Sequence, residues 1–199
     1  MKKVFVITIA GLLTSVMLNA QNWFSVSPDS DTAGSKCLVG SVNYEQLFLE
    51  GGDALKSSWG ISSNLGMDYF VMDNIYAGAS LGFSQRYIKY DFGDYGDTKS
   101  SIFDLWIPIR AGVSLLRSNI KLETGPFASF TLGGSTTSTF GGEMTTTRVK
   151  DMDITRAALG WSININVFRL LNIGYSFMLT DSPYGDGGDF GFLTIGLTI

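Results

Sequence analysis

Eight charged residues at alternate positions of apolar segments are the residues of this chain best placed to do chemistry. They are four acids and four bases: Glu45, Asp68, Asp104, Glu123, Arg86, Arg110, Lys121 and Arg156. Carboxylates beside guanidinium or ammonium groups form charge-assisted hydrogen bonds and ion pairs. The chain of 199 residues contains no histidine, the side chain that most often transfers protons near neutral pH. The eight residues therefore indicate a charge-balanced network, and we expect neither enzymatic activity nor a cofactor.

Two groups of aspartates could supply the oxygen ligands that calcium prefers. They are Asp91, Asp94 and Asp97 in one segment and Asp181, Asp186 and Asp189 in another. Neither group has the spacing of a known calcium loop, so solvated turns are the simpler interpretation and no metal site is predicted. The single cysteine, Cys37, excludes an intramolecular disulfide and a metal site built from several thiolates.

The elements that carry these charges alternate in polarity. In FDLWIPIRAGVSL (103–115) every odd position is apolar, whereas Asp104, Pro108 and Arg110 lie at even positions. A period of two is typical of β-strands, and eight such segments follow one another from about Leu38 to Ile199. Short links are expected at 72–74, 117–119 and 168–170, and long polar ones at about 47–58, 91–100, 134–151 and 181–188. An even strand number with tight turns at one end and long loops at the other predicts an all-β, eight-stranded antiparallel transmembrane up-and-down β-barrel.

The direction in which each face points separates two kinds of barrel. A soluble ligand-binding barrel such as a lipocalin would place its polar face in water, where many more lysines and glutamates are expected. The polar face here carries few charges, and they balance. We therefore expect the apolar face to contact lipid and the charges to fill a narrow lumen. Aromatic residues near the strand ends would form interfacial girdles, namely Trp59, Tyr69, Tyr87, Trp161 and Tyr175.

The hairpin that turns at 117–119 makes a specific geometric prediction. In a regular register Arg110 lies almost opposite Gly125 and diagonal to Glu123, within reach of an ion pair. The other charged residues are expected to join this pair in a wider network. The same register brings Pro108 beside Pro126, and since proline donates no backbone hydrogen bond, we expect a bulge or a break in the ladder there.

The N-terminus indicates export. Lys2 and Lys3 precede an uncharged apolar stretch that ends near Ala20, the pattern of a cleavable signal peptide at residues 1–20. Residues 21–36 would then form a periplasmic segment or a partial plug, followed by the barrel at 37–199. The formal net charge of −4 gives no support for nucleic-acid binding.

Three stretches carry a resemblance to a family. DLWIPIRAGVSL, KLETGPFASFTLGG and LNIGYSFMLTD resemble strands of the outer-membrane β-barrel proteins common in Bacteroidetes-type bacteria. That class is similar to the small barrels related to OmpA and OmpX. The chain departs from their commonest pattern because it ends on Ile199, which is not aromatic. The resemblance implies location in the outer membrane of a Gram-negative bacterium, contact with outer-membrane lipid, and insertion by the barrel-assembly machinery.

Three functions remain open at this point. The first is a non-enzymatic envelope or surface-interaction protein that binds an extracellular protein or glycan through its long loops, since binding sites concentrate in loops on rigid scaffolds. The second is a narrow or gated pore for ions or small solutes, lined by the eight charged residues. The third is the soluble ligand-binding barrel. The sequence does not identify a ligand, an oligomeric state or calcium binding.

Overall fold

The computed structural model describes residues 31–49, 52–116, 119–152, 156–168, 170–184 and 190–198. The proposed signal peptide and residues 21–30 lie outside this range. The described strands are β1 (Lys36–Phe48), β2 (Leu55–Met72), β3 (Ile75–Asp91), β4 (Gly96–Leu115), β5 (Ile120–Phe140), β6 (Glu143–Arg148), β7 (Ala157–Val167), β8 (Leu171–Met178) and β9 (Gly191–Thr198). Three 3-10 turns accompany them, η1 (Gly52–Ala54), η2 (Gly93–Tyr95) and η3 (Val149–Asp151). No helix in the described part of the chain is long and apolar enough to cross a membrane.

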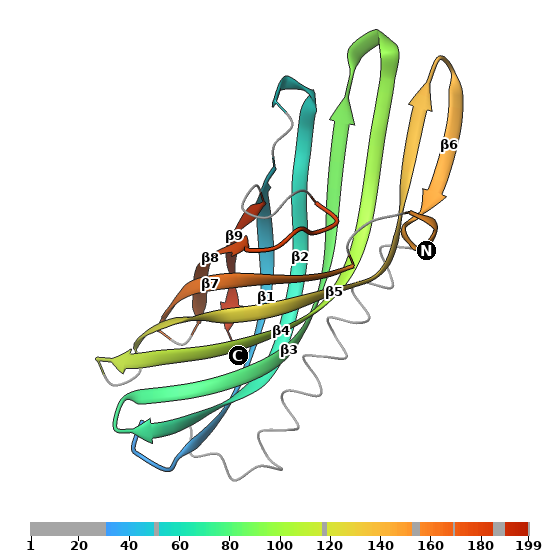
Figure 1. Ribbon diagram of the computed structural model, residues 1–199. Coiled ribbons are helices and arrows are strands. Elements are labelled where there is room, and N and C mark those ends of the chain that lie inside the picture. The colour runs from blue at the N-terminus through green and yellow to red at the C-terminus, as the bar shows by residue number, and fades with distance from the viewer. Residues whose placement is uncertain are drawn as a thin grey trace.

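Eight of the strands close into an antiparallel ring (Figure 1). Neighbours along the chain pair from β1 to β5, β5 pairs with β7, and the ring continues through β8 and β9 back to β1. Strand β6 stays outside the ring because it pairs only with the second half of β5, while β7 pairs with the first half. The predicted eight-stranded up-and-down barrel is confirmed.

The long polar segments differ from the sequence prediction. Residues 91–100 and 134–151 were expected to be loops, but β4 begins at Gly96, β5 continues to Phe140, and β6 adds another strand. Threonine has high β-propensity, and hydroxyl side chains pair across the strands, as in Ser100 with Thr136 at 2.9 Å. A two-residue turn at Gly141 and Gly142, both with positive φ, closes the β5–β6 hairpin.

The two prolines coincide with gaps in the β3–β4 and β4–β5 ladders, whereas the β5–β7 ladder runs through Pro126, which pairs with Trp161. Within the described strands β3 and β4, pairing passes from Ala79–Ile109 to Gly82–Trp106 and skips the residue opposite Pro108. Between β4 and β5 it passes from Pro108–Phe127 to Ala111–Thr124 and skips Pro126. The predicted break at the prolines is confirmed, and Pro108 lies opposite Phe127, next to Pro126. The register shift of the β4–β5 pair lies higher, between Phe103 and Asp104.

An apolar belt surrounds the ring. On β4 it runs from Phe103 to Leu115 and on β5 from Ile120 to Leu132, with large apolar side chains exposed at alternate positions. Exposed apolar surface of this extent is unfavourable in water and favourable in hydrocarbon. The soluble-barrel alternative, in which apolar faces point inward, is therefore wrong.

The aromatic residues of the belt occupy different depths. Trp59 and Tyr87 pack together at its upper edge, with ring centroids 5.8 Å apart. Trp161 was expected at an interface, but it pairs with Pro126 opposite the middle of the β4 belt. Its indole N–H donates to Thr124 Oγ1 at 2.7 Å, so this polar group has a partner at that depth.

The depth of the belt can be tested at Ile109, which lies midway between Phe103 and Leu115 and is 57% exposed. The Ile109→Arg variant should lower the free energy of unfolding by ~2–4 kcal/mol, because a charge would face hydrocarbon at the midplane. Reversible urea unfolding in lipid vesicles measures this. The Thr146→Arg control lies above the belt and should change stability little; an equal loss in both variants would contradict the assigned depth.

Candidate functional site

The lumen holds most of the charged residues singled out from the sequence. Because side chains alternate along a strand, residues between the lipid-facing positions point inward. Five of the charged side chains are less than 10% exposed, namely Glu45, Asp68, Arg86, Asp104 and Arg110. Glu123 and Lys121 are each 13% exposed. These seven residues form two networks at different depths.

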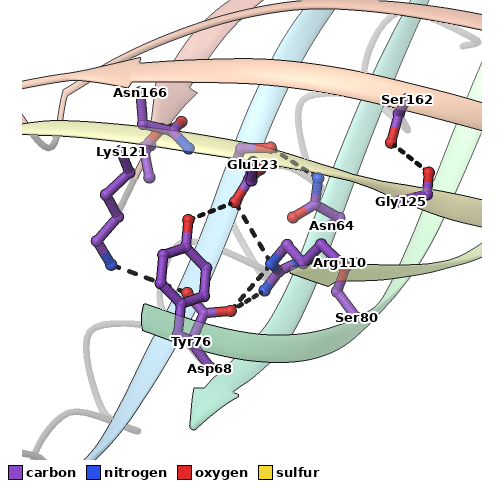
Figure 2. A network of polar contacts seen from close by, with 12 residues as sticks. Asn64, Asp68, Tyr76, Ser80, Arg110, Lys121, Glu123, Gly125, Ser162 and Asn166 are labelled. Atoms are coloured by element: carbon purple, nitrogen blue, oxygen red, sulfur yellow. Dashed lines mark hydrogen bonds and ion pairs between the residues drawn. The ribbon is translucent and has the colours of Figure 1, made fainter. Parts of the chain in front are cut away.

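The first network surrounds Arg110, toward the ends of β2 and β4 (Figure 2). Its Nε donates to Asp68 Oδ1 at 2.9 Å, and its Nη1 donates to Ser80 Oγ at 3.0 Å. The predicted ion pair with Glu123 is present at 3.6 Å between Nε and Oε2. Asp68 on β2, one strand beyond the neighbouring β3, is thus the tighter partner.

Two further side chains complete this lower network. The phenol of Tyr76 donates to Glu123 Oε2 at 3.1 Å, and Lys121 Nζ lies 3.8 Å from Asp68 Oδ2. Lys121 also lies over the rings of Phe70 and Tyr76, at 5.5 and 5.1 Å from their centroids. Cation–π contacts of this kind contribute more when the cation is desolvated. Two acids and two bases therefore balance within one cluster.

The second network surrounds Arg86 higher in the lumen. Its Nε donates to Glu45 Oε2 at 2.8 Å and its Nη1 to Asp104 Oδ2 at 3.0 Å. Asp104 also accepts hydrogen bonds from Thr131 Oγ1 and from the phenol of Tyr184. Tyr184 belongs to the segment after β8, and burial raises the pKa of its phenol well above the usual value, so it remains a donor.

Arg156 lies outside both networks, and its assignment to the lumen was wrong. It has the inward parity of β7 but precedes the first residue of that strand, Ala157, so the alternation does not extend to it. Its side chain is exposed, and Nη2 donates to the carbonyl of Lys150 at 2.6 Å.

An apolar plug surrounds Arg86 in the lumen. Rings of four aromatic residues lie 4.4–5.6 Å from the Arg86 guanidinium carbon: Trp106, Tyr184, Phe190 and Phe192. They pack on a buried cluster of Leu47, Ile88, Phe127, Ala158, Met178, Phe190 and Phe192. We call these residues, with Trp106 and Tyr184, the aromatic plug. It closes the lumen on the side of the long hairpins.

Sequence reasoning missed the plug, although a signal for it was available. Ile88, Phe127 and Phe192 are apolar residues on the otherwise polar, inward face of their strands. Each lies an even number of positions from an inward polar residue of its own strand: Arg86, Glu123 and Thr194 respectively. Large apolar residues at inward positions of several strands at one height predict an apolar layer in the lumen. The hydrogen bonds that Tyr76, Ser80 and Tyr184 make to the charge networks could not be predicted from the sequence in this way. They depend on the register between strands and on the conformation of the segment after β8.

A polar cavity of about 300 Å³ lies below the plug. Its walls are rich in carboxamides and hydroxyls, together with the lower charge network. The described end of the N-terminal segment lies at the turn-side rim of the barrel: Asp31, which lines the cavity, accepts from Ser114 Oγ at 2.6 Å, and Ala33 N donates to Asp73 Oδ1 at 2.9 Å. These contacts join the segment to the β2–β3 turn and to the end of β4, and the role of residues 21–36 as a periplasmic segment or a partial plug stays a prediction.

The aspartate groups do not form a metal site in the described chain. Among the described residues, no group of three cysteine or carboxylate side chains is arranged to hold a metal ion. Asp97 instead pairs with Lys99 at 2.7 Å, and this contact lowers the pKa of the Asp97 carboxyl. Asp186 and Asp189 lie outside the described residues.

A second candidate site projects beyond the belt. It consists of 88–91 on β3, 96–102 on β4, 133–140 on β5 and all of β6, and we call it the projecting sheet (Figure 1). Seven residues of β4 at ~3.3 Å each reach on the order of 20 Å past Phe103. Serines, threonines and charged residues occupy most positions on both faces, a composition that excludes it from hydrocarbon.

Comparison with known proteins finds similarity only among solved structures. No family model and no curated protein matches the chain. The attachment invasion locus protein Ail of Yersinia pestis is 13% identical, with a TM-score of 0.45, covering 84% of this chain and all of Ail. Neisserial surface protein A is 11% identical, with a TM-score of 0.44, covering 83% of this chain and 98% of that protein. A structure of Ail with the heparin analogue sucrose octasulfate gives 15% identity and a TM-score of 0.42, covering 84% of this chain and all of Ail.

The localisation follows from the pairing and burial of this chain. Within the belt the ring of eight strands closes without a free edge, its outside is apolar, and its inside holds the charged side chains. This is the architecture of the barrels in the outer membrane of Gram-negative bacteria, where short turns face the periplasm. The chain is a transmembrane protein of that membrane, and the projecting sheet is extracellular.

Arg86 provides a test of the upper network. The Arg86→Met variant should lose ~3–5 kcal/mol of unfolding free energy, because two buried carboxylates would lack their cation. Adding Glu45→Gln and Asp104→Asn should recover part of the loss, since the uncompensated charges are then removed. Urea unfolding followed by the heat-modifiable gel shift measures both variants.

The matched control is Arg156→Met, which removes an exposed arginine that lies outside the networks. It should stay within ~0.5 kcal/mol of wild type. Equal stability of Arg86→Met and Arg156→Met would show that the buried network does not support the barrel.

Proposed function

We propose that this chain is a non-enzymatic outer-membrane barrel that contacts an extracellular protein or glycan through its projecting sheet. The observation that supports this most directly is the sheet itself. Strands β3, β4 and β5 continue well past the belt, and membrane anchoring requires no such extension. Cross-strand contacts such as Thr98 with Ser138, at 3.1 Å, join its strands. An ordered extracellular surface loses less entropy on binding than a flexible loop.

The lumen supports a structural role for the charged residues and weighs against the pore alternative. The aromatic plug packs around Arg86 in the lumen, and Asp31 contacts Ser114 at the turn end of β4. Eight strands leave an interior that side chains can fill. Six of the lumen residues make short ion pairs or hydrogen bonds with one another, a sign of packing and not of transport.

Two finer assignments belong to the same proposal. The absence of histidine and the mutual pairing of the lumen carboxylates support a protein without catalytic activity. The sequence motifs at 104–115, 121–134 and 171–181 support a place among the small barrels common in Bacteroidetes-type bacteria.

Shortening the hairpin tests the surface role. Replacing residues 137–146 by Asn-Gly would reconnect the paired residues Thr136 and Thr147 with a two-residue turn and leave the ring unchanged. A non-adherent bacterial host that displays the full barrel should adhere to epithelial cells or to immobilised matrix proteins and glycans. The same host displaying the shortened variant should not adhere.

The control for this experiment is the heat-modifiable gel shift, which reports that the shortened barrel is folded and inserted. A matched variant replaces Gly141–Gly142 by Asn-Gly at full hairpin length and should keep adhesion. Equal adhesion of the shortened and full-length barrels would contradict the proposed function.

The sealed lumen makes a separate electrical prediction. In planar bilayers the wild-type barrel should show no large steady openings, because the plug blocks the ion path. The Phe190→Ala and Phe192→Ala double variant removes two rings that cover Arg86 and should show measurable conductance. Steady wild-type conductance equal to that of the double variant would favour the pore alternative.

A further inference from the structure

The two faces of the projecting sheet differ in charge. On the outer face Lys89 lies directly opposite Lys99, and Arg148 at the end of β6 pairs with Ser135. The hydrogen bonds of Thr98 with Ser138 and of Ser100 with Thr136 identify the other face, which lies above the barrel mouth and which we call the inner face. Every lysine and arginine in the described part of the projecting sheet lies on the outer face.

The inner face carries a run of aromatic rings to the tip. Tyr90 packs against the buried plug cluster and stacks with Phe92 at 6.3 Å between centroids. Phe92 packs against Phe140 at 5.9 Å. Phe92 and Phe140 are 43% and 46% exposed, and Tyr95 in η2 is 79% exposed. We call Phe92, Tyr95 and Phe140 the aromatic tip.

Exposed rings at the far end of a polar extracellular sheet have no role in membrane insertion or in sealing the lumen. Burial of three such rings would remove a large apolar area from water. Aromatic side chains are also the residues that most often dominate protein–protein binding. The tip therefore has the composition of a contact site.

The charges beside the tip define the partner. Glu143 pairs with Phe140 across the hairpin and is exposed, and Asp94 is exposed in the turn beside Tyr95. The outer face carries Lys89, Lys99 and Arg148 together with Asp91 and Asp97, and Asp97 pairs with Lys99 at 2.7 Å. Because the described inner face carries no lysine or arginine, the charges on the side of the rings are acidic. Such a surface repels sulfated glycans and anionic lipid, and it attracts a cationic partner.

We infer that the aromatic tip and its acidic neighbours Asp94 and Glu143 form a docking surface for a protein segment that presents large apolar side chains beside lysine or arginine. This inference rests on the proposed surface-interaction role and specifies its partner as a basic protein surface. The rings supply the contact area, and the two carboxylates select the charge. The rows of Ser and Thr below the tip hold the rings clear of the membrane.

A defined probe tests this chemistry. The refolded full-length barrel in nanodiscs is the target for selection from a random 12-residue peptide library displayed on phage. Selected peptides should be enriched in lysine or arginine together with large apolar residues. A synthetic consensus peptide should bind the Tyr95→Ser variant at least tenfold more weakly than wild type. The Asp94→Asn, Glu143→Gln variant should bind it several-fold more weakly and with less dependence on salt.

The matched controls lie on the outer face. Met144 is 73% exposed and pairs with Thr139, so Met144→Ser removes an equally accessible apolar side chain from the opposite face. Met144→Ser and Lys99→Gln should leave peptide affinity unchanged. The heat-modifiable gel shift verifies that every variant is folded. Tyr95→Ser is the main test variant because Tyr95 is the most exposed ring of the aromatic tip.

Three results would overturn the inference: selection of acidic peptides, affinity that Tyr95→Ser does not lower, or tip-independent binding of heparin or of anionic lipid vesicles tighter than that of any peptide. Adhesion separates this failure from that of the proposed function. If the shortened hairpin loses adhesion while Tyr95→Ser retains it, the docking surface is wrong and the surface role stands. If the shortened hairpin still adheres, the surface role itself fails.

Discussion

The lipid-facing belt forces every charged side chain of the membrane-spanning strands into the lumen. Charge is too costly in hydrocarbon to remain outside, and an eight-stranded ring encloses too little space to hydrate it fully. Each inward acid must therefore find a base on another strand. Arg86 meets Glu45 and Asp104 from β1 and β4, and Arg110 meets Asp68 and Glu123 from β2 and β5. Two of these pairs join adjacent strands, and the pairs Arg86–Glu45 and Arg110–Asp68 each bridge over one intervening strand.

The constraint also explains why the lumen changes character along its length. Ion pairs fill the lower and middle parts, where several strands bring charges to one height. Around Arg86 the inward positions hold Ile88, Phe127 and Phe192, and the segments beside β9 add Tyr184 and Phe190. The aromatic rings pack against the Arg86 guanidinium, and Glu45 and Asp104 neutralise its charge. The plug and the upper charge network are therefore in direct contact through Arg86.

The sequence was sufficient for the properties that depend on alternation. Strand number, the direction of each face, the break at Pro108 and the Arg110–Glu123 pair all follow from a period of two and one hairpin register. It was insufficient where contacts come from strands far apart in the chain. The primary partner of Arg110 is Asp68, 42 residues away, and no local register identifies it. Arg156 shows the opposite error, because alternation was extended beyond the strand that produces it. The polar segments at 91–100 and 134–151 were misassigned because Ser, Thr and Gly occur both in loops and in solvated strands.

The continuity between plug and projecting sheet links the membrane barrel to its extracellular surface. Tyr90 contacts the plug cluster at one end and Phe92 at the other, so the ring stack that reaches the tip is anchored in the lumen. The strands that carry this stack are the same strands that cross the membrane, with no flexible link between the two parts of β4 or β5. A surface built in this way is ordered before any partner arrives, and binding need not supply the free energy to order it. The barrel thus acts as a rigid foundation, and the buried charges of the lumen serve the extracellular face by fixing the geometry of the strands that reach it.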